Sequence, residues 1–143
     1  MNFQFSSFYF LLSLYIHRFA QLPALAAQRS GLGLEIELDN RLAGDLPPSA
    51  TQATAYRIVQ EALTNVVRHS AASRATIVLD RDADHLVVTV LDDGSGIPAD
   101  SPERGGLRGM RERAELVDGA LTVAPGAGGG TAVTARLPWK ASS

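Results

Sequence analysis

Three short clusters of residues carry side chains or backbone that can do chemistry. Glu61 to His69 reads EALTNVVRH, with a carboxylate and an amide on what we expect to be a long helix. Asp92 to Pro98 reads DDGSGIP and follows an apolar strand, and Gly105 to Met110 reads GGLRGM, where a loop becomes a helix. Carboxylate, amide and glycine-rich backbone suit a ligand that carries phosphate and amine groups.

The first cluster depends on helical spacing. At about 100° per residue, Glu61, Asn65 and Arg68 lie within roughly 60° of one another on the flank of the apolar face. The Asn65 amide oxygen is a hard ligand suited to magnesium, whose other ligands would be phosphates and water. Glu61 can orient or deprotonate an attacking group. The alternative is a solvated stripe with an internal charge pair between Glu61 and Arg68.

The second cluster places a carboxylate at a strand end. Asp92 can accept a hydrogen bond from an exocyclic amine such as that of adenine. Gly94 and Gly96 remove the Cβ atoms that would block a flat ring. A tight turn is the alternative, because Asp-Gly and Ser-Gly are common turn dipeptides. Asp93 and Asp100 suggest a calcium loop only weakly, since the EF-hand spacing is missing.

The third cluster joins glycines to a helix start. Backbone amides there, with no side chains in the way, form a natural phosphate cradle. No Gly-Lys-Ser/Thr follows, so this is not a Walker motif, and no strand precedes it as in a dinucleotide fingerprint. A flexible packing loop is the alternative interpretation.

The elements that must position these clusters alternate irregularly. A short helix is expected to begin at Pro23 and to stop near Gly31. Ser49 or Thr51 can cap a long helix, and Gly119 can end a third one. Helices are predicted over Pro23–Arg29, over a stretch covering 55–67, and over Leu107–Val117. Strands are predicted over 34–38, 75–79, 86–91, 121–123 and 131–137. Hairpins dominate, so we expect an α+β fold with a mixed, mostly antiparallel sheet and helices on one face.

Length and composition limit the class of protein. The 143 residues support one domain, with 45% hydrophobic and 20% charged residues and a net charge of -2. That charge gives no indication of a nucleic-acid partner. The chain has no cysteine, which excludes disulfides and cysteine-ligated zinc and suits a reducing, cytoplasmic location.

The first twenty residues differ from the rest. The apolar run 8–16 is stopped by His17 and Arg18 and is shorter than the ~20 residues of a spanning helix. We expect residues 1–20 to be a leader outside the domain: the stub of a parent helix, a packing segment, or a start-site artefact. The domain is expected over 21–139, with a tail over 140–143. Membrane association would come only through a parent protein.

In the order and spacing of these clusters, the sequence resembles the ATPase family shared by sensor histidine kinases, the gyrase B subunit, MutL proteins and a heat-shock chaperone. The stretch 55–65 with Arg68 and His69 resembles the asparagine box of nitrate-sensor-like and desaturase-regulating histidine kinases. Gly109 to Arg113 and Gly129 to Thr131 are similar to the same group. The resemblance implies the two-layer α/β sandwich known as the Bergerat fold.

Roles follow residue by residue from this resemblance. It implies that Asn65 binds magnesium bridging the ATP phosphates, that Glu61 is catalytic, and that Asp92 holds the adenine amine. The other residues implied in ATP binding are Arg68, His69, Gly94, Gly96, Gly106, Leu107, Gly109, Met110 and Thr131. Of these, Gly106 to Met110 would form the phosphate end and the hinge of a lid, and Thr131 the inner wall. Catalysis would rest on positioning and charge neutralisation.

Two departures stand out. Arg104 occupies a position where the family usually carries glycine, which affects the expected lid. The phosphoacceptor histidine normally precedes an acidic residue, whereas His17, His69 and His85 precede Arg18, Ser70 and Leu86.

We therefore expect an ATP- and magnesium-dependent catalytic domain that phosphorylates a histidine on a separate dimerisation domain, and through it a response regulator. The alternatives are a serine kinase of the anti-sigma-factor type and a non-catalytic, nucleotide-responsive binding module.

Overall fold

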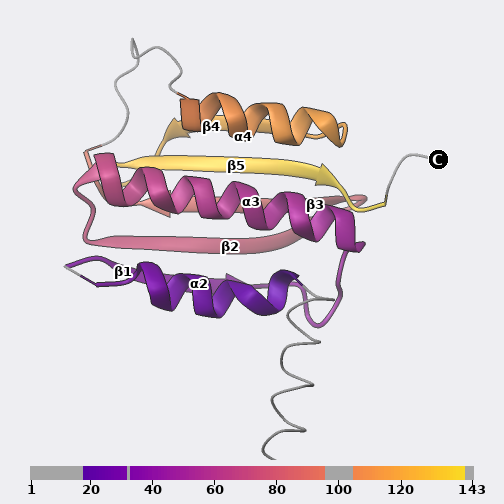
Figure 1. The fold of residues 1–143 in the computed structure, drawn as a ribbon, viewed down its shortest axis with the longest axis horizontal. Coiled ribbons are helices and arrows are strands. Elements are labelled where there is room, and N and C mark those ends of the chain that lie inside the picture. The colour runs from indigo at the N-terminus through magenta and orange to yellow at the C-terminus, as the bar shows by residue number, and fades with distance from the viewer. Residues whose placement is uncertain (1–17, 32, 96–104, 141–143) are drawn as a thin grey trace, which may run out of the picture.

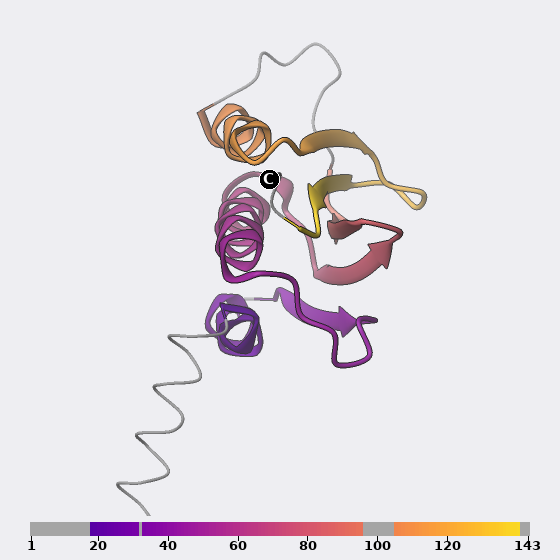
Figure 2. The ribbon, with the colours of Figure 1, turned by 90° about the vertical axis from the view of Figure 1, so that its right-hand side faces the viewer.

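The computed structural model describes residues 18–31, 33–95 and 105–140. A five-stranded sheet has the order β1-β2-β3-β5-β4, with β1 and β2 parallel and the other neighbours antiparallel. The helices cover one face of this sheet (Figures 1 and 2). The expected α+β fold is confirmed. The elements are η1 (Arg18–Gln21), α2 (Leu22–Arg29), β1 (Glu35–Asn40), α3 (Ser49–Asn65), η2 (Val66–Ser70), β2 (Arg74–Asp82), β3 (His85–Asp92), α4 (Gly105–Leu116), β4 (Ala120–Pro125) and β5 (Thr131–Pro138).

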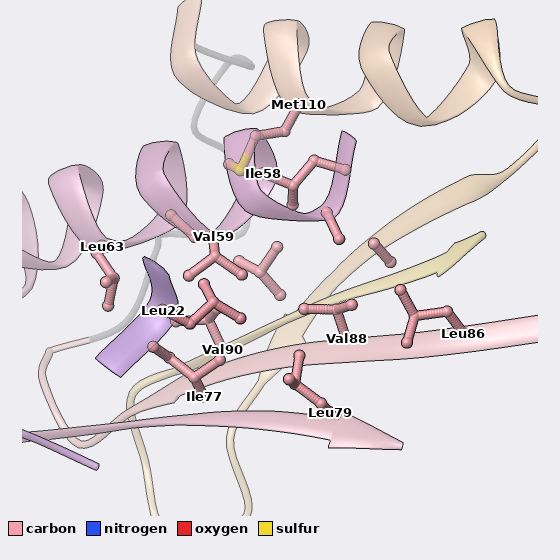
Figure 3. Close-up of a cluster of buried hydrophobic side chains, with 14 of the residues drawn as sticks. Leu22, Ile58, Val59, Leu63, Ile77, Leu79, Leu86, Val88, Val90 and Met110 are labelled. Atoms are coloured by element: carbon pink, nitrogen blue, oxygen red, sulfur yellow. The ribbon is translucent and has the colours of Figure 1, made fainter. Parts of the chain in front are cut away.

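The core lies between the helices and the sheet (Figure 3). Strands β2 and β3 alternate buried and partly exposed residues, because successive side chains of a strand point to opposite faces. Each fully buried aliphatic side chain contributes roughly 1.5–3 kcal/mol. Side chains that are at most 2% exposed come from α3, β2 and β3 in particular: Ile58, Val59, Leu63, Ile77, Leu79, Leu86, Val88 and Val90.

Helix α3 begins without a side-chain cap. Pro48 is the N-cap residue, and its carbonyl accepts the Gln52 N–H at 3.0 Å. The prediction that Ser49 or Thr51 caps the helix is wrong. Instead, the Thr51 hydroxyl donates to the Pro138 carbonyl at 3.3 Å and so ties the start of α3 to the end of β5.

Helix α4 ends near Gly119, as expected, but Gly119 is not the residue in the left-handed conformation. Asp118, with φ of 60°, is the residue in the left-handed conformation. Gly119 donates its N–H to the Ala114 carbonyl at 2.8 Å. A Cβ on Gly119 would lie 2.6 Å from the Arg136 carbonyl oxygen, so glycine is required there for the close approach of β5.

The core reaches into the segment expected to be a leader. Phe19 is buried, and its N–H donates to Gln52 Oε1 at 3.1 Å. The Gln52 amide in turn donates to the Pro47 carbonyl at 2.9 Å. Phe19 therefore packs with the domain, although the boundary was expected at residue 21. Residues 1–17 lie outside the described part. Within the described ranges, no helix is both long enough and apolar enough to cross a membrane.

Candidate functional site

The element ends that carry the three clusters lie at one end of the sheet. The carboxyl ends of α3 and β3 lie there together with the amino ends of α4 and β5, at the left in Figure 1. Each of the three chemically interesting clusters occupies one of these ends. The fold thus brings together segments that are far apart in the sequence.

The first and third clusters are in contact through Gly106. A Cβ placed on Gly106 would lie 3.0 Å from Asn65 Oδ1 and 3.2 Å from Glu61 Oε1. Both polar side chains therefore lie against the first turn of α4, and they are half-buried. Only a residue without a side chain leaves their positions undisturbed. The contact places a carboxylate and an amide beside a helix start, where backbone N–H groups are unpaired within the helix.

Beyond Asn65 the helix changes its geometry. Val66–Ser70 forms a π-helical turn that ends at Ala71 in the left-handed conformation, with φ of 53°. The predicted stripe of Glu61, Asn65 and Arg68 assumed α-helical spacing, and a π-helical turn holds more residues than an α-helical one. Arg68 is exposed, and among the ion pairs of the described residues none joins it to Glu61. His69 lies within this turn.

The second cluster meets the start of β5. Asp92 pairs with Thr131, which is buried, in the antiparallel register of β3 and β5. The Asp92 carboxylate accepts the Gly94 N–H at 2.9 Å through Oδ1. A Cβ on Gly130 would overlap the Asp92 carbonyl oxygen and lie 3.0 Å from the Gly94 nitrogen. Gly96 lies outside the described residues.

Asp93 faces a different set of partners. Its Oδ1 accepts the N–H groups of Ser73 and Arg74 at 2.8 and 2.9 Å, and its Oδ2 accepts the Ser73 hydroxyl at 2.8 Å. These bonds, first that from the Arg74 N–H and then that from the Ser73 hydroxyl, hold the pKa of the Asp93 carboxyl below its ordinary value. The calcium-loop interpretation of Asp93 has no support here, because backbone and hydroxyl donors occupy the carboxylate.

The remaining predicted residues lie on α4. Leu107 and Gly109 are half-buried, and space around Gly109 is open to an added Cβ. Met110 is fully buried in the core, so its side chain anchors the helix rather than lining an open site. Arg104 lies outside the described residues.

This arrangement suits a phosphate-bearing ligand bound with a metal. The part of the chain that the structure describes holds no group of three or more acidic or histidine side chains able to bind a metal ion. A magnesium ion needs few protein ligands when phosphates and water supply the rest. The Asn65 amide oxygen beside the α4 start fits that need, with Asp92 at the neighbouring strand end.

Residues 50–141 match the family described as histidine kinase-, DNA gyrase B- and HSP90-like ATPases. The chain belongs to this family. The described residues of the three clusters lie at one end of the fold. The described domain is of the ATP-binding catalytic type found in sensor histidine kinases.

Two curated relatives are sensor kinases. The sensor histidine kinase YxjM of Bacillus subtilis is 40% identical over 111 residues, and UhpB of Salmonella typhimurium, a signal transduction histidine-protein kinase/phosphatase, is 36% identical over 107. The matches cover 78% and 74% of this chain but 27% and 21% of the relatives. The chain thus spans about a quarter of the length of these proteins.

Solved structures share the fold. The ATP binding domain of PrrB from Mycobacterium tuberculosis superposes with a TM-score of 0.66 at 23% identity, covering 84% of this chain and 90% of that domain. A histidine kinase domain from a blue-light activated kinase of Erythrobacter litoralis gives 0.67 at 24% identity, covering 82% and 57%.

Sequence reasoning did not assign a site role to Gly130 or Asp93. Gly130 was visible as the last of three consecutive glycines before a strand, a signal for close backbone approach. Asp93 gave no comparable signal, because its partners are nearly twenty positions earlier in the chain and only the pairing of β2 with β3 brings them together.

Proposed function

We propose that this domain transfers the γ-phosphoryl group of ATP to a histidine on a separate dimerisation domain. The observation that carries the proposal is the packing of Glu61 and Asn65 against Gly106, at the end of the sheet where Asp92 lies. A carboxylate, an amide and a helix start thus share one site. Phosphoryl transfer asks a protein chiefly for positioning and charge neutralisation, and such groups supply both.

Asp92 is the proposed adenine contact. Its Oδ1 is held by the Gly94 N–H, which fixes the carboxylate, and a carboxylate has further lone pairs to accept an amine. Thr131 lies opposite Asp92 at the start of β5 and forms the inner wall. Gly94 and Gly96 carry no side chain and would leave room for the ring.

The phosphate end is proposed to lie where α3 meets α4. A bound magnesium ion would neutralise phosphate charge. Asn65 would hold it through its amide oxygen, and the backbone at Gly106 would approach the phosphates without steric hindrance. Leu107, Gly109 and Met110 would set the hinge of a lid, with Met110 as its buried anchor. Arg68 and His69 would contact the nucleotide from the π-helical turn.

Magnesium provides a direct test of this arrangement. We expect ATP to bind more tightly with the metal in the parent domain, and this dependence to disappear in Asn65→Ala. Calorimetric titration with and without magnesium measures it. Equal magnesium sensitivity in both proteins would assign Asn65 a merely structural role.

Glu61 is the proposed catalytic carboxylate. It lies one helical turn before Asn65 and beside Gly106, so it would flank the reacting phosphoryl group. There it can orient the attacking imidazole or accept its proton.

The partners are proposed from the relatives. They are a histidine-containing dimerisation domain and, through it, a response regulator, in the subfamily of nitrate-sensor-like and desaturase-regulating kinases. Use of ATP and transfer to a regulator place the domain in the cytoplasm in this proposal. His69 and His85 precede Ser70 and Leu86, so neither is in the acidic context of an acceptor.

Transfer in trans tests the proposed function. The isolated chain is expected not to label itself from radioactive ATP, and a dimerisation hairpin from a matching sensor kinase is expected to acquire acid-labile, alkali-stable phosphate. Glu61→Ala should slow this labelling. Acid-stable label on an added protein would favour the serine-kinase alternative, and binding without transfer would favour a nucleotide-responsive module.

A further inference from the structure

Asp92 and Asp93 are adjacent carboxylates with opposite surroundings. Asp92 is the last residue of β3 and lies at the site, next to Gly94 and Gly130. Asp93 is the first residue beyond the strand, and its contacts are made to the residues that lead into β2. The chain therefore changes partners between these two positions.

Four hydrogen bonds join Asp93 to the start of β2. The carboxylate accepts the N–H groups of Ser73 and Arg74 and the Ser73 hydroxyl, all at 2.8 to 2.9 Å. The Asp93 N–H donates to the Arg74 carbonyl at 3.2 Å and extends the ladder by one residue. Together these four contacts fix residue 93 against the residues that lead into β2.

The connection continues to the edge of the sheet. The Ser73 carbonyl accepts the Glu35 N–H at 2.9 Å, where β1 begins. Asp93 thus links the end of β3 through Ser73 to the first residue of β1. The ends of β3, β2 and β1 are thus linked through Asp93 and the main chain of Ser73, on the side of Asp92 opposite to β5.

Gly130 closes the other side of Asp92. It has a φ of +73° and lies so close that any Cβ would overlap the Asp92 carbonyl oxygen. The backbone of Asp92 is therefore held between β5 and the contacts of Asp93. The position of the Asp92 side chain follows from that of its backbone, because the hydrogen bond from the Gly94 N–H leaves the carboxylate little freedom to rotate.

We propose that Asp93 is a positioning residue for nucleotide binding, which anchors the end of β3 to β2 so that Asp92 is presented to the adenine amine. The proposal rests on the proposed function of Asp92. Asp93 does not touch the nucleotide, and its role is geometric rather than one of charge.

If the contacts of Asp93 matter rather than its charge, a neutral side chain that keeps those contacts should preserve ATP binding. An asparagine at 93 can keep every contact: its Oδ1 accepts both N–H groups, and its amide can donate to the Ser73 oxygen. Asp93→Asn should therefore preserve binding, whereas Asp93→Ala removes three bonds. Ser73→Ala removes only the hydroxyl contact and should have a smaller effect.

The experiment combines calorimetric ATP binding with hydrogen exchange of the Gly94 amide, followed by NMR without nucleotide. Asp93→Ala is expected to weaken ATP binding about tenfold, the effect of roughly one net hydrogen bond, and to speed Gly94 exchange. Asp93→Asn should bind within about twofold of the parent and leave Gly94 exchange unchanged. The matched control is Asp82→Ala, which removes an exposed carboxylate from the far end of β2 and should change neither measurement.

Two results would overturn the proposal: parent-like binding and Gly94 exchange in Asp93→Ala, or equal losses in Asp93→Ala and Asp93→Asn, which would assign the effect to charge. Asp92→Asn separates this proposal from the adenine role, since it should abolish ATP binding. If it does not, the adenine role fails, and parent-like Gly94 exchange in Asp93→Ala would then refute the positioning role as well. If folding suffers in Asp93→Ala, Ser73→Ala supplies the same comparison in a milder form.

Discussion

At the end of the sheet where β3 stops and β5 begins, backbone atoms make the close contacts, and glycines permit them. Gly106 lies against Asn65 and Glu61, and Gly130 against the Asp92 backbone. At these two glycines little space remains for an added side chain. The site end depends on small residues and on hydrogen bonds to the main chain.

The opposite end of the sheet is held by side chains. The Arg81 guanidinium lies 3.9 Å from the ring centre of Trp139, whose side chain is buried. Arg136 bonds to Asp82 at 2.7 Å across the sheet. Aromatic burial stabilises a fold without requiring precise backbone approach. We infer that side chains at this end contribute mainly to the free energy of unfolding, whereas close contacts at the site end fix the positions of the ATP-binding groups. The following substitutions test that difference.

Trp139→Ala should have the largest effect on stability. Loss of a buried aromatic side chain costs about 3–5 kcal/mol of unfolding free energy. Urea unfolding measures that loss, and calorimetry should give ATP affinity within about twofold of the parent for the folded protein. The exposed neighbour Lys140→Ala is the control, with a change below about 0.5 kcal/mol. A large loss of affinity in folded Trp139→Ala would contradict the division of roles.

Gly130→Ala should lower both the free energy of unfolding and the affinity for ATP. Alanine in the left-handed region costs roughly 1–2 kcal/mol, and the overlap with the Asp92 carbonyl adds about 1–3 kcal/mol. Because Asp92 must move, ATP affinity should fall at least tenfold. The control is Gly128→Ala, in the same turn, where an added Cβ meets nothing within 4 Å. Similar behaviour of the two variants would show that the close approach at Gly130 is unimportant.

Gly106→Ala should separate binding from stability. Its Cβ would press on Asn65 and Glu61 at 3.0 to 3.2 Å and displace them by a few tenths of an ångström. ATP affinity should fall about fivefold, while unfolding free energy stays level or rises by up to ~1 kcal/mol, because alanine favours a helix. Glu115→Ala, at an exposed position of the same helix, should leave affinity unchanged. Unaltered affinity in Gly106→Ala would remove the support for a phosphate site at this contact.

Arg136→Gln should have the smallest effect. The hydrogen bond from Arg136 is the main cause that lowers the pKa of Asp82 below its ordinary 3.8. A lowered pKa in the folded state gives stability that is present above the ordinary value and lost as the pH falls through the folded value. The parent and Arg136→Gln should therefore differ slightly at pH 7 and converge below pH ~3.8 or in ~1 M salt. Midpoints of urea unfolding measured across pH would show this convergence. A difference in stability that stays constant with pH would point to lost packing of the arginine side chain instead.

Much of the fold could be predicted from periodic patterns. The apolar spacing of 55–67 predicted α3, and the runs of strand-forming residues in 75–79 and 86–91 predicted the strands β2 and β3. The predictions failed where the cause was not periodic. Pro48 begins α3 without the expected cap, and the turn after Asn65 is π-helical rather than α-helical.

The sequence by itself determined the family and the three clusters, because the chemistry of Glu61, Asn65 and Asp92 depends on residue type and local spacing. Only the tertiary structure decided which groups are neighbours. The contact of Gly106 with Asn65 and the anchoring of Asp93 join segments that are distant in the chain. Such contacts arise when helices and strands pack to bury the shared core, and no local pattern encodes the distances that result.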